Sequence, residues 1–328
     1  MNALSLRDQV IAMFLCVGVG DALGLPVETM TAEAINKKFG RVTDYLDTAF
    51  HRDFVGSPKG TTSDDTQRTK SVACSFIRSR GFDMDDQARA YIEGGNVSTR
   101  GWGGSMRQAY DRLNAGAHWS VSGTPGGAGN GVSISVGFFA PYFLSERLRG
   151  NDLPWRHFHS MCDFARMSHA TTMAAASAVV MIEALLLAFE SKPPYYFRKL
   201  HASAVFVESY EGDVSQAKLS KALRGLWKID NATTDKEIRK LFGNASSYVY
   251  ESLPVALALF LRKPDSIDAL YDAVNFGGDT DSVASMVGAL LGARNGTTII
   301  PDHLLAGLQG KDEILKVANE FCDTFNIN

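Results

Sequence analysis

The sequence predicts an all-α protein, because apolar residues recur at helical spacing in run after run and convincing strand alternation is nearly absent. Its 328 residues contain no Pro-, Gly- or Ser-rich linker and no repeat of solenoid period. Hydrophobic residues make up 45% and charged residues 21%, which suffices for a sizeable core. We therefore expect a single domain over residues 1–328.

The expected elements begin with a helix that Ser5 can cap and that carries apolar residues at helical spacing from Val10 to Val17. We expect the glycines after Val17 to loosen this helix into a loop. Asp21 and Glu28 would then lie at or just beyond its end.

Two later helices are expected to begin at acidic clusters. One covers residues 67–80 and follows Ser63-Asp64-Asp65-Thr66, and the other covers residues 282–294 and follows Gly277-Gly278-Asp279-Thr280-Asp281. Further helix-like runs lie at residues 152–167, 172–190, 217–228, 235–242, 253–261 and 266–273. The polar, charge-mixed stretch 191–244 is expected to be a peripheral helical insertion.

Composition limits the partners that the protein can bind and the cellular compartment in which we expect it. The formal net charge of -3 gives no basic field for sequence-independent nucleic acid binding. The apolar runs 10–19 and 173–189 are expected to be buried helices, neither a signal peptide nor a membrane span. The scattered cysteines have no metal or redox spacing, so we expect reduced thiols and a cytoplasmic location.

The two acidic clusters predict one metal site if the fold brings them together. Gathered carboxylates repel one another unless divalent cations neutralise them or their pKa values rise. Hard oxygen ligands favour magnesium, manganese or calcium. The alternative is that each cluster only caps its own helix, since Ser and Asp accept the free N–H groups of a first turn.

Three other motifs resemble known binding sites, for a dinucleotide, for calcium and for zinc, but each lacks a feature that such a site needs. Gly18-x-Gly20-x-x-x-Gly24 follows a helix pattern instead of a strand, which disfavours dinucleotide binding. Asp279-x-Asp281 lacks the later ligands of an EF-hand loop. His157-x-His159 has no matching ligand nearby and is interpreted as part of a polar helix face.

Several short motifs are spread along almost the whole chain, and their order is more specific than any one of them. They are Gly20-Asp21-Ala22-Leu23-Gly24 with Glu28 downstream, Ser63-Asp64-Asp65-Thr66, Arg100-Gly101-Trp102-Gly103, Gly129-Asn130-Gly131, Ser168-His169, residues 248–254 and Gly277-Gly278-Asp279-Thr280-Asp281-Ser282. In this order the chain resembles the ADP-ribosylglycohydrolase family. The resemblance implies an all-α, compact orthogonal helical bundle with two Mg²⁺ or Mn²⁺ ions in a cleft.

The resemblance also implies roles for particular residues. The implied metal ligands are Ser63, Asp64, Asp65, Asp279, Asp281 and Ser282. The implied catalytic carboxylates are Glu28, Asp64 and Asp65, and which of them acts as base stays open. The implied substrate-binding residues are Gly127, Gly129, Asn130, Gly131, His169, Gly277 and Gly278. Glycines let backbone N–H groups approach phosphates closely, although the loop 126–131 could also be an ordinary flexible loop.

We therefore expect a hydrolase that removes ADP-ribose from an ADP-ribosylated protein or a small ADP-ribosyl acceptor, with ADP-ribosyl-arginine as the first expectation. The alternatives are a two-metal nucleotide phosphohydrolase and a catalytically silent protein that binds ADP-ribose or serves structurally. Retention of all four aspartates argues against the silent protein. The chain departs from the family after Gly131, where Val-Ser-Ile-Ser replaces a segment that usually begins Met-Arg.

Overall fold

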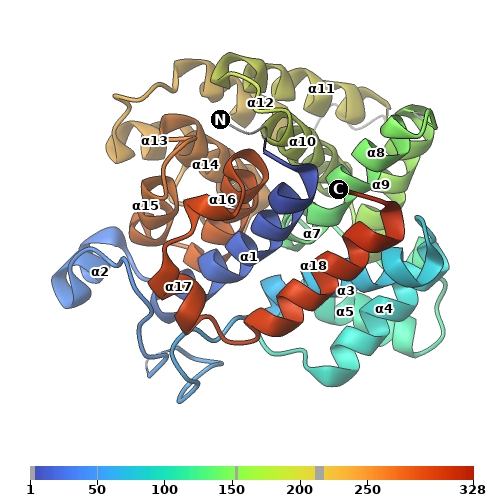
Figure 1. Cartoon of the computed structure of the whole chain (residues 1–328), viewed down its shortest axis with the longest axis horizontal. Helices are drawn as coiled ribbons and strands as arrows, with labels where there is room; N and C mark the ends of the chain where they lie inside the picture. Colours follow the sequence, from blue (N-terminus) through green and yellow to red (C-terminus); the bar gives the residue numbers. More distant parts are fainter. Residues whose placement is uncertain (1–3, 50, 152–153, 211–217) are drawn as a thin grey trace.

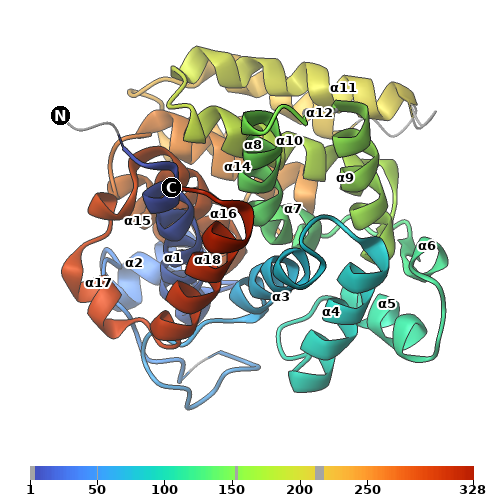
Figure 2. The same cartoon turned by 45° about the vertical axis from the view of Figure 1, so that its right-hand side comes forward.

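Helix α1 (Leu6–Gly24) lies at the centre of the protein and packs along α16 (Thr280–Asn295), with α18 (Lys311–Phe325) beside it. The structure is a computed structural model that describes residues 4–49, 51–151, 154–210 and 218–328. Figures 1 and 2 both show these three helices, from opposite ends of the chain, side by side. The first and last segments of the sequence therefore build one common core.

The other helices surround this centre. In chain order they are η1 (Leu25–Val27), α2 (Ala32–Phe39), α3 (Asp64–Ser79), α4 (Met84–Val97), α5 (Gly104–Asn114), α6 (Trp119–Ser122), α7 (Gly131–Ser135), η2 (Val136–Phe138), α8 (Phe139–Leu148), α9 (Pro154–Ser168), α10 (Thr172–Phe189), η3 (Pro194–Lys199), α11 (Leu200–Tyr210), α12 (Lys218–Leu223), η5 (Arg224–Lys228), α13 (Asp235–Phe242), α14 (Val249–Arg262), α15 (Asp268–Phe276), η6 (Thr297–Ile299) and α17 (Asp302–Gly307). Within the described residues the strands are two short ones, β1 (Thr124–Pro125) and β2 (His169–Ala170), which pair in parallel. The all-α expectation is confirmed.

Helix α1 does not end where the sequence led us to expect. It continues through its glycines to Gly24, because these glycines are contact points with α16. A Cβ on Gly20 would lie 2.3 Å from the Ala284 carbonyl oxygen, and one on Gly24 would lie 2.4 Å from the Asp281 nitrogen. The missing side chains thus let two backbones approach closely, and Asp21 lies inside the last turn of α1.

The two helices expected at the acidic clusters begin there. Ser63 caps α3, and Asp279 is the N-cap residue of α16. The expected helix starts at Asp152 and Ala217 lie outside the described residues. Part of the Gly-rich stretch 123–137 is helical, since α7 begins at Gly131 and η2 follows it from Val136.

The stretch 191–244 forms helices around α10 and α14. Helix α11 packs on α10, and α13 packs on α14.

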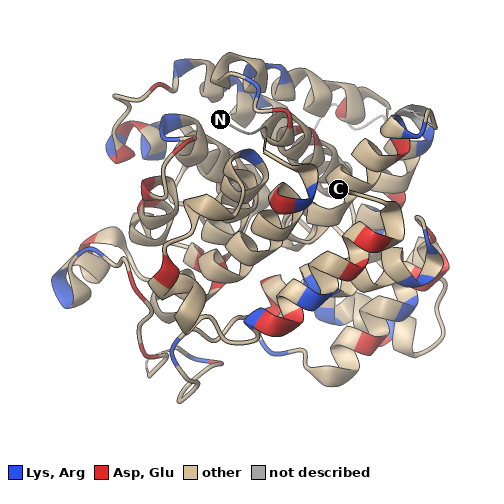
Figure 3. Cartoon of the chain, viewed as in Figure 1, with Lys and Arg blue, Asp and Glu red and all other residues tan. Residues whose placement is uncertain are grey.

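Acidic and basic residues are interspersed over the ribbon, as α18 illustrates in Figure 3.

Two helical segments are long and apolar enough to cross a membrane by length and composition alone. They are Leu6–Val27, with 94% of the apolar window buried, and Thr172–Phe189, with 72% buried. Other parts of the chain cover most of both, so both are core helices in this structure. The four cysteines, all within the described residues, form no disulfide bond with one another.

Candidate active site

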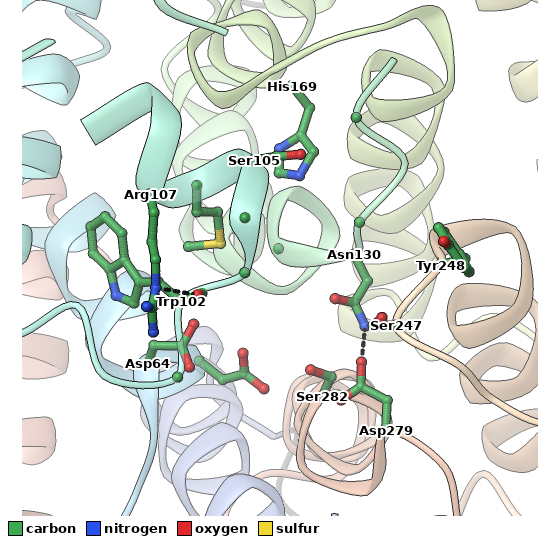
Figure 4. Close-up of a pocket in the computed structure, with 18 of the residues that line it drawn as sticks. Asp64, Trp102, Ser105, Arg107, Asn130, His169, Ser247, Tyr248, Asp279 and Ser282 are labelled. Carbon is green, nitrogen blue, oxygen red and sulfur yellow. Dashed lines mark hydrogen bonds between the residues drawn. The ribbon is translucent and has the colours of Figure 1, made fainter. Parts of the chain in front are cut away.

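A pocket of about 830 Å³ lies where the N-termini of α3, α5 and α16 face the loop before α7. The residues that line it include Glu28, Arg52, Asp53, Phe54, Asp64, Asp65, Gly101, Trp102, Ser105, Arg107, Gly127, Gly129, Asn130, Gly131, His169, Ser247, Tyr248, Asp279, Asp281 and Ser282. Figure 4 shows Asp64 on one side, Asp279 and Ser282 on the other, and His169 at the far end.

The first acidic cluster is held in place by the buried carboxylate of Asp21. Its oxygens accept hydrogen bonds from the Ser63 N–H (2.9 Å), the Thr66 N–H (3.1 Å) and the Thr66 hydroxyl (2.6 Å). The Ser63 hydroxyl in turn accepts from the Asp65 N–H at 3.2 Å. Helix α1 thus fixes the N-terminus of α3 and leaves Asp64 and Asp65 facing the pocket.

The second acidic cluster is tied to the Gly-rich loop. The Asn130 amide donates to Asp279 Oδ2 at 2.8 Å, shown as a dashed line in Figure 4. The Ser282 N–H donates to Asp281 Oδ1 at 2.9 Å. Asp279, Asp281 and Ser282 are all buried. The second cluster is therefore shielded from solvent, and these hydrogen bonds orient its carboxylates.

The electrostatics of the gathered carboxylates are unfavourable when they are all ionised. Burial first, and neighbouring carboxylates second, raise the pKa values of Asp64, Asp65 and Asp281. Burial also raises the pKa of Asp279, against hydrogen bonds from Asn130 and Ser282. A nearby cation would offset both the cost of burying these charges and the repulsion between the carboxylates.

The donor set fits a hard divalent cation. One oxygen each from Glu28, Asp279 and Asp281 lie within 4.8 Å of one another. Asp65 Oδ2 is buried and has no hydrogen-bond partner among the described residues. Carboxylate and hydroxyl oxygens are the ligands that Mg²⁺, Mn²⁺ and Ca²⁺ prefer. These residues could therefore hold a metal.

At the far end of the pocket the Gly-rich loop lies against His169. The β1–β2 pair brings the two segments together, and a Cβ on Gly129 would lie 3.2 Å from His169 Nε2. Burial lowers the pKa of His169 to about 4, so its imidazole is neutral near pH 7. Its Nδ1 lies 2.9 Å from the Ser168 hydroxyl oxygen. A neutral imidazole beside a Gly-rich loop suits a polyhydroxylated, anionic ligand.

The 100–107 segment forms one wall of the pocket. Gly101 has φ +84°, and a Cβ there would lie 2.1 Å from Asp64 Oδ1. Trp102 is buried and donates to Gln67 through its indole nitrogen. Arg107 Nε donates to the Trp102 carbonyl at 2.7 Å, and its side chain reaches toward Asp64 in Figure 4. The sequence motif Arg100 to Gly103 thus packs the site, and Arg107 was not anticipated.

Three expected site residues do not lie on the pocket wall. Ser63 is the cap of α3, behind Asp65. Gly277 and Gly278 form a turn with positive φ in which Cβ atoms would meet backbone atoms at 2.7 and 2.4 Å. The structure places these three behind the carboxylates, as supports for their backbones, whereas the other expected residues line the pocket.

His51 is a site residue that sequence reasoning missed. Its Nε2 lies 2.5 Å from Glu28 Oε2, and it is buried. The contact joins residues 23 positions apart, and no spacing or periodicity signals it. Asp53, Arg107 and Ser247 were missed for the same reason.

Comparisons with known proteins agree with this arrangement. A family model described as ADP-ribosylglycohydrolase matches residues 2–327. Human ADP-ribosylhydrolase ARH3 is 24% identical over 76% of this chain and 75% of its own length. The ADP-ribosyl-[dinitrogen reductase] glycohydrolase of Rhodospirillum rubrum is 24% identical over 95% of this chain and 94% of its own.

Two further similarities extend the comparison. ADP-ribosylarginine hydrolase Tri1 of Pseudomonas putida is 24% identical over 96% of this chain and 78% of its own length. A solved structure described as an ADP-ribosylglycohydrolase-related protein complex superposes with a TM-score of 0.74 at 26% identity, covering 98% of this chain and 99% of that chain.

Proposed function

The chain belongs to the ADP-ribosylglycohydrolase family, an enzyme family that removes ADP-ribose from acceptors, and from this premise we propose that it releases ADP-ribose from ADP-ribosyl-arginine with the help of bound Mg²⁺ or Mn²⁺. The observation that carries the proposal is the convergence of Glu28, Asp279 and Asp281 within 4.8 Å in a pocket that Asp64 and Asp65 also line.

The metal part of the proposal rests on the carboxylates. Asp64, Asp65, Asp279 and Asp281, with Ser282 as a hydroxyl ligand, would hold two cations. Their raised pKa values and the unpartnered Asp65 Oδ2 support this assignment. When bound, divalent cations would supply positive charge that stabilises the developing transition state and lowers the pKa of a coordinated water.

The substrate would lie along the pocket between its two ends. The Gly127 and Asn130 N–H groups donate to the Thr124 and Ser247 carbonyls, so the other N–H groups of the loop 126–131 would face the diphosphate. The neutral His169 would hydrogen-bond a ribose hydroxyl. The ribose anomeric carbon would then lie near the carboxylates. Asn130 would keep Asp279 oriented toward this position.

The reaction would replace the bond between the anomeric carbon and the acceptor by a bond to water oxygen. The ring oxygen would share positive charge as the bond to the acceptor breaks. Glu28 would accept a proton from the attacking water at Oε1, since its Oε2 is engaged by His51. The acceptor nitrogen would take up a proton as it leaves, and Glu28 would release the proton that it accepted, so that one water is consumed and the enzyme returns to its starting state.

Arginine is proposed as the acceptor because one relative is named an ADP-ribosylarginine hydrolase. The experiment measures free ADP-ribose released from arginine-modified and from serine-modified protein, with Mn²⁺, with Mg²⁺ and with EDTA. Release from the arginine-modified protein that EDTA abolishes supports the proposal. Release from the serine-linked substrate alone would overturn the acceptor, and release in EDTA would overturn the metal requirement.

A further inference from the structure

The segment 51–57 holds a histidine against a carboxylate in the pocket. His51 is 8% exposed, and its Nε2 lies 2.5 Å from Glu28 Oε2. Glu28 is also one of the three residues whose oxygens converge within 4.8 Å. The contact therefore involves the one residue of these three that lies outside the two acidic clusters.

The hydrogen bonds around the imidazole decide which nitrogen faces Glu28 as a donor. His51 Nδ1 accepts from the Asp53 N–H at 3.1 Å and from the Phe54 N–H at 3.2 Å. An imidazole nitrogen that accepts carries no proton, so the proton of the neutral ring is on Nε2. The Nε2–H of His51 consequently donates to Glu28 Oε2.

The segment that carries His51 is itself fastened to the pocket wall. Arg100 lies over the Phe54 ring at 4.2 Å, and its Nε donates to the Asp53 carbonyl at 2.5 Å. The Thr48 hydroxyl donates to the Ser57 carbonyl at 2.9 Å and closes the loop. His51 therefore meets Glu28 from a fixed position.

The backbone next to Glu28 is held in an unusual conformation. Thr29 has φ +68°, which is rare for a β-branched residue. Its N–H donates to the Gly278 carbonyl at 2.7 Å, next to Asp279 in the chain. Such conformations persist only where their surroundings impose them, and they concentrate at functional sites. Glu28 is thus oriented from its backbone by Gly278 and from its carboxylate by His51.

We propose that His51 is a positioning residue that fixes the Glu28 carboxylate through its Nε2–H, so that Oε1 faces the reacting water and the metal ligands. The inference rests on the proposed function for the role of Glu28. His51 touches Glu28 only through a side-chain hydrogen bond, and hydrogen-bond partners of this kind orient the groups that act in metal sites.

Two substitutions separate this role from a purely structural one. His51→Asn keeps an acceptor where Nδ1 caps the Asp53 and Phe54 N–H groups, but it is too short to reach Glu28. His51→Gln can place an N–H donor near the position of Nε2 but loses the loop cap. If His51 serves only to fold the loop, the Asn variant should resemble the native protein more than the Gln variant does.

The test measures ADP-ribose release and Mn²⁺ binding by calorimetry on the full chain. We expect His51→Asn to lose 10- to 100-fold in kcat, with a smaller change in KM and weaker Mn²⁺ binding. His51→Gln should recover most of this loss. In the Glu28→Ala background, His51→Asn should cost nothing further, because its effect passes through Glu28.

The outcomes keep the inference distinct from the proposed function. No ADP-ribose release by the native protein would overturn the proposed function. Unchanged Mn²⁺ binding in His51→Asn would, independently of that result, overturn the positioning role of His51. With an active native protein, equal kcat in the Asn and native forms, or an additive loss in the Glu28→Ala background, would overturn the role of His51.

Discussion

The side-chain amide of Asn130 donates a 2.8 Å hydrogen bond to Asp279 Oδ2, across 149 positions of sequence. The bond links the loop that faces one end of the pocket to the carboxylate cluster at the other. A change at Asn130 should therefore alter the orientation of the Asp279 carboxylate.

Replacement of Asn130 tests this link. Asn130→Ala removes the donor and should weaken Mn²⁺ binding about 10-fold, as the loss of a hydrogen-bond partner of a metal ligand typically does. Asn130→Asp also removes the donor, but its added carboxylate repels Asp279 in the metal-free protein and attracts the cation, so Mn²⁺ binding should weaken less than in Asn130→Ala. Calorimetry with Mn²⁺ measures both, and the exposed Asn231→Ala is the control. Native affinity in Asn130→Ala would show that the bond has no influence on the metal ligands.

Metal loading should stabilise the protein more at pH 8 than at pH 5. The carboxylates of Asp64, Asp65, Asp279 and Asp281 have raised pKa values, mainly through burial. A raised carboxyl pKa means that the folded protein holds protons which the unfolded chain has released, so these groups lower stability as pH rises above about 4. Bound cations replace those protons, and binding is stronger where the protons are already gone.

Thermal unfolding with and without Mn²⁺ measures this difference. At a free Mn²⁺ concentration 100 times Kd, binding to the folded state alone adds about 2.7 kcal/mol. The increase in melting temperature should be lost in the Asp279→Asn, Asp281→Asn double variant. An equal increase in that variant would place the binding of Mn²⁺ elsewhere on the chain.

The sequence predicted the main parts of the site because they are local signals. Each acidic cluster lies at a helix N-terminus, where Ser63 and Asp279 are recognisable as caps. Helical periodicity likewise predicted the all-α class. The resemblance to a family supplied the expectation that the clusters meet.

The parts that could not be predicted depend on contacts between distant residues. Nothing local shows that Gly20 and Gly24 allow α1 to lie against α16, so the helix was expected to end early. His51 lies in a loop without periodicity, and its function follows only from the position of Glu28. Gly277 and Gly278 share a motif with Asp279, yet they support its backbone instead of lining the pocket.

Gly101 should be intolerant of a side chain because of Asp64. It has φ +84°, and an added Cβ would lie 2.1 Å from Asp64 Oδ1. Gly101→Ala should cost about 1–2 kcal/mol of stability from the backbone conformation. It should also reduce turnover 10-fold or more, since Asp64 must move away.

Gly56→Ala separates the two effects. Gly56 has nearly the same φ, +77°, but a Cβ there would meet nothing within 4 Å. Urea unfolding should therefore show similar losses of stability for the two variants, while ADP-ribose release falls only in Gly101→Ala. A comparable loss of turnover in both would assign the effect to the backbone and not to Asp64.

His169 should make the protein less stable in acid. Burial, and secondarily the charge of Arg68, lower its pKa from 6.5 to about 4. Between these pH values the unfolded chain binds a proton at this position that the folded protein does not, so the free energy of unfolding falls as pH decreases through this window. The contribution is fully present above pH 6.5, and its loss amounts to about 3 kcal/mol by pH 4.

His169→Gln keeps hydrogen-bonding groups but has no group that titrates in this range. Urea unfolding of both proteins in EDTA, at pH 7.5 and at pH 4.5, gives the decrease in unfolding free energy for each. The decrease should be smaller in the variant, and comparing the two proteins cancels the contributions of the carboxylates that both retain. Equal decreases would mean that the imidazole becomes protonated as readily in the folded protein as in the unfolded chain, which would contradict a neutral, buried His169 in the pocket.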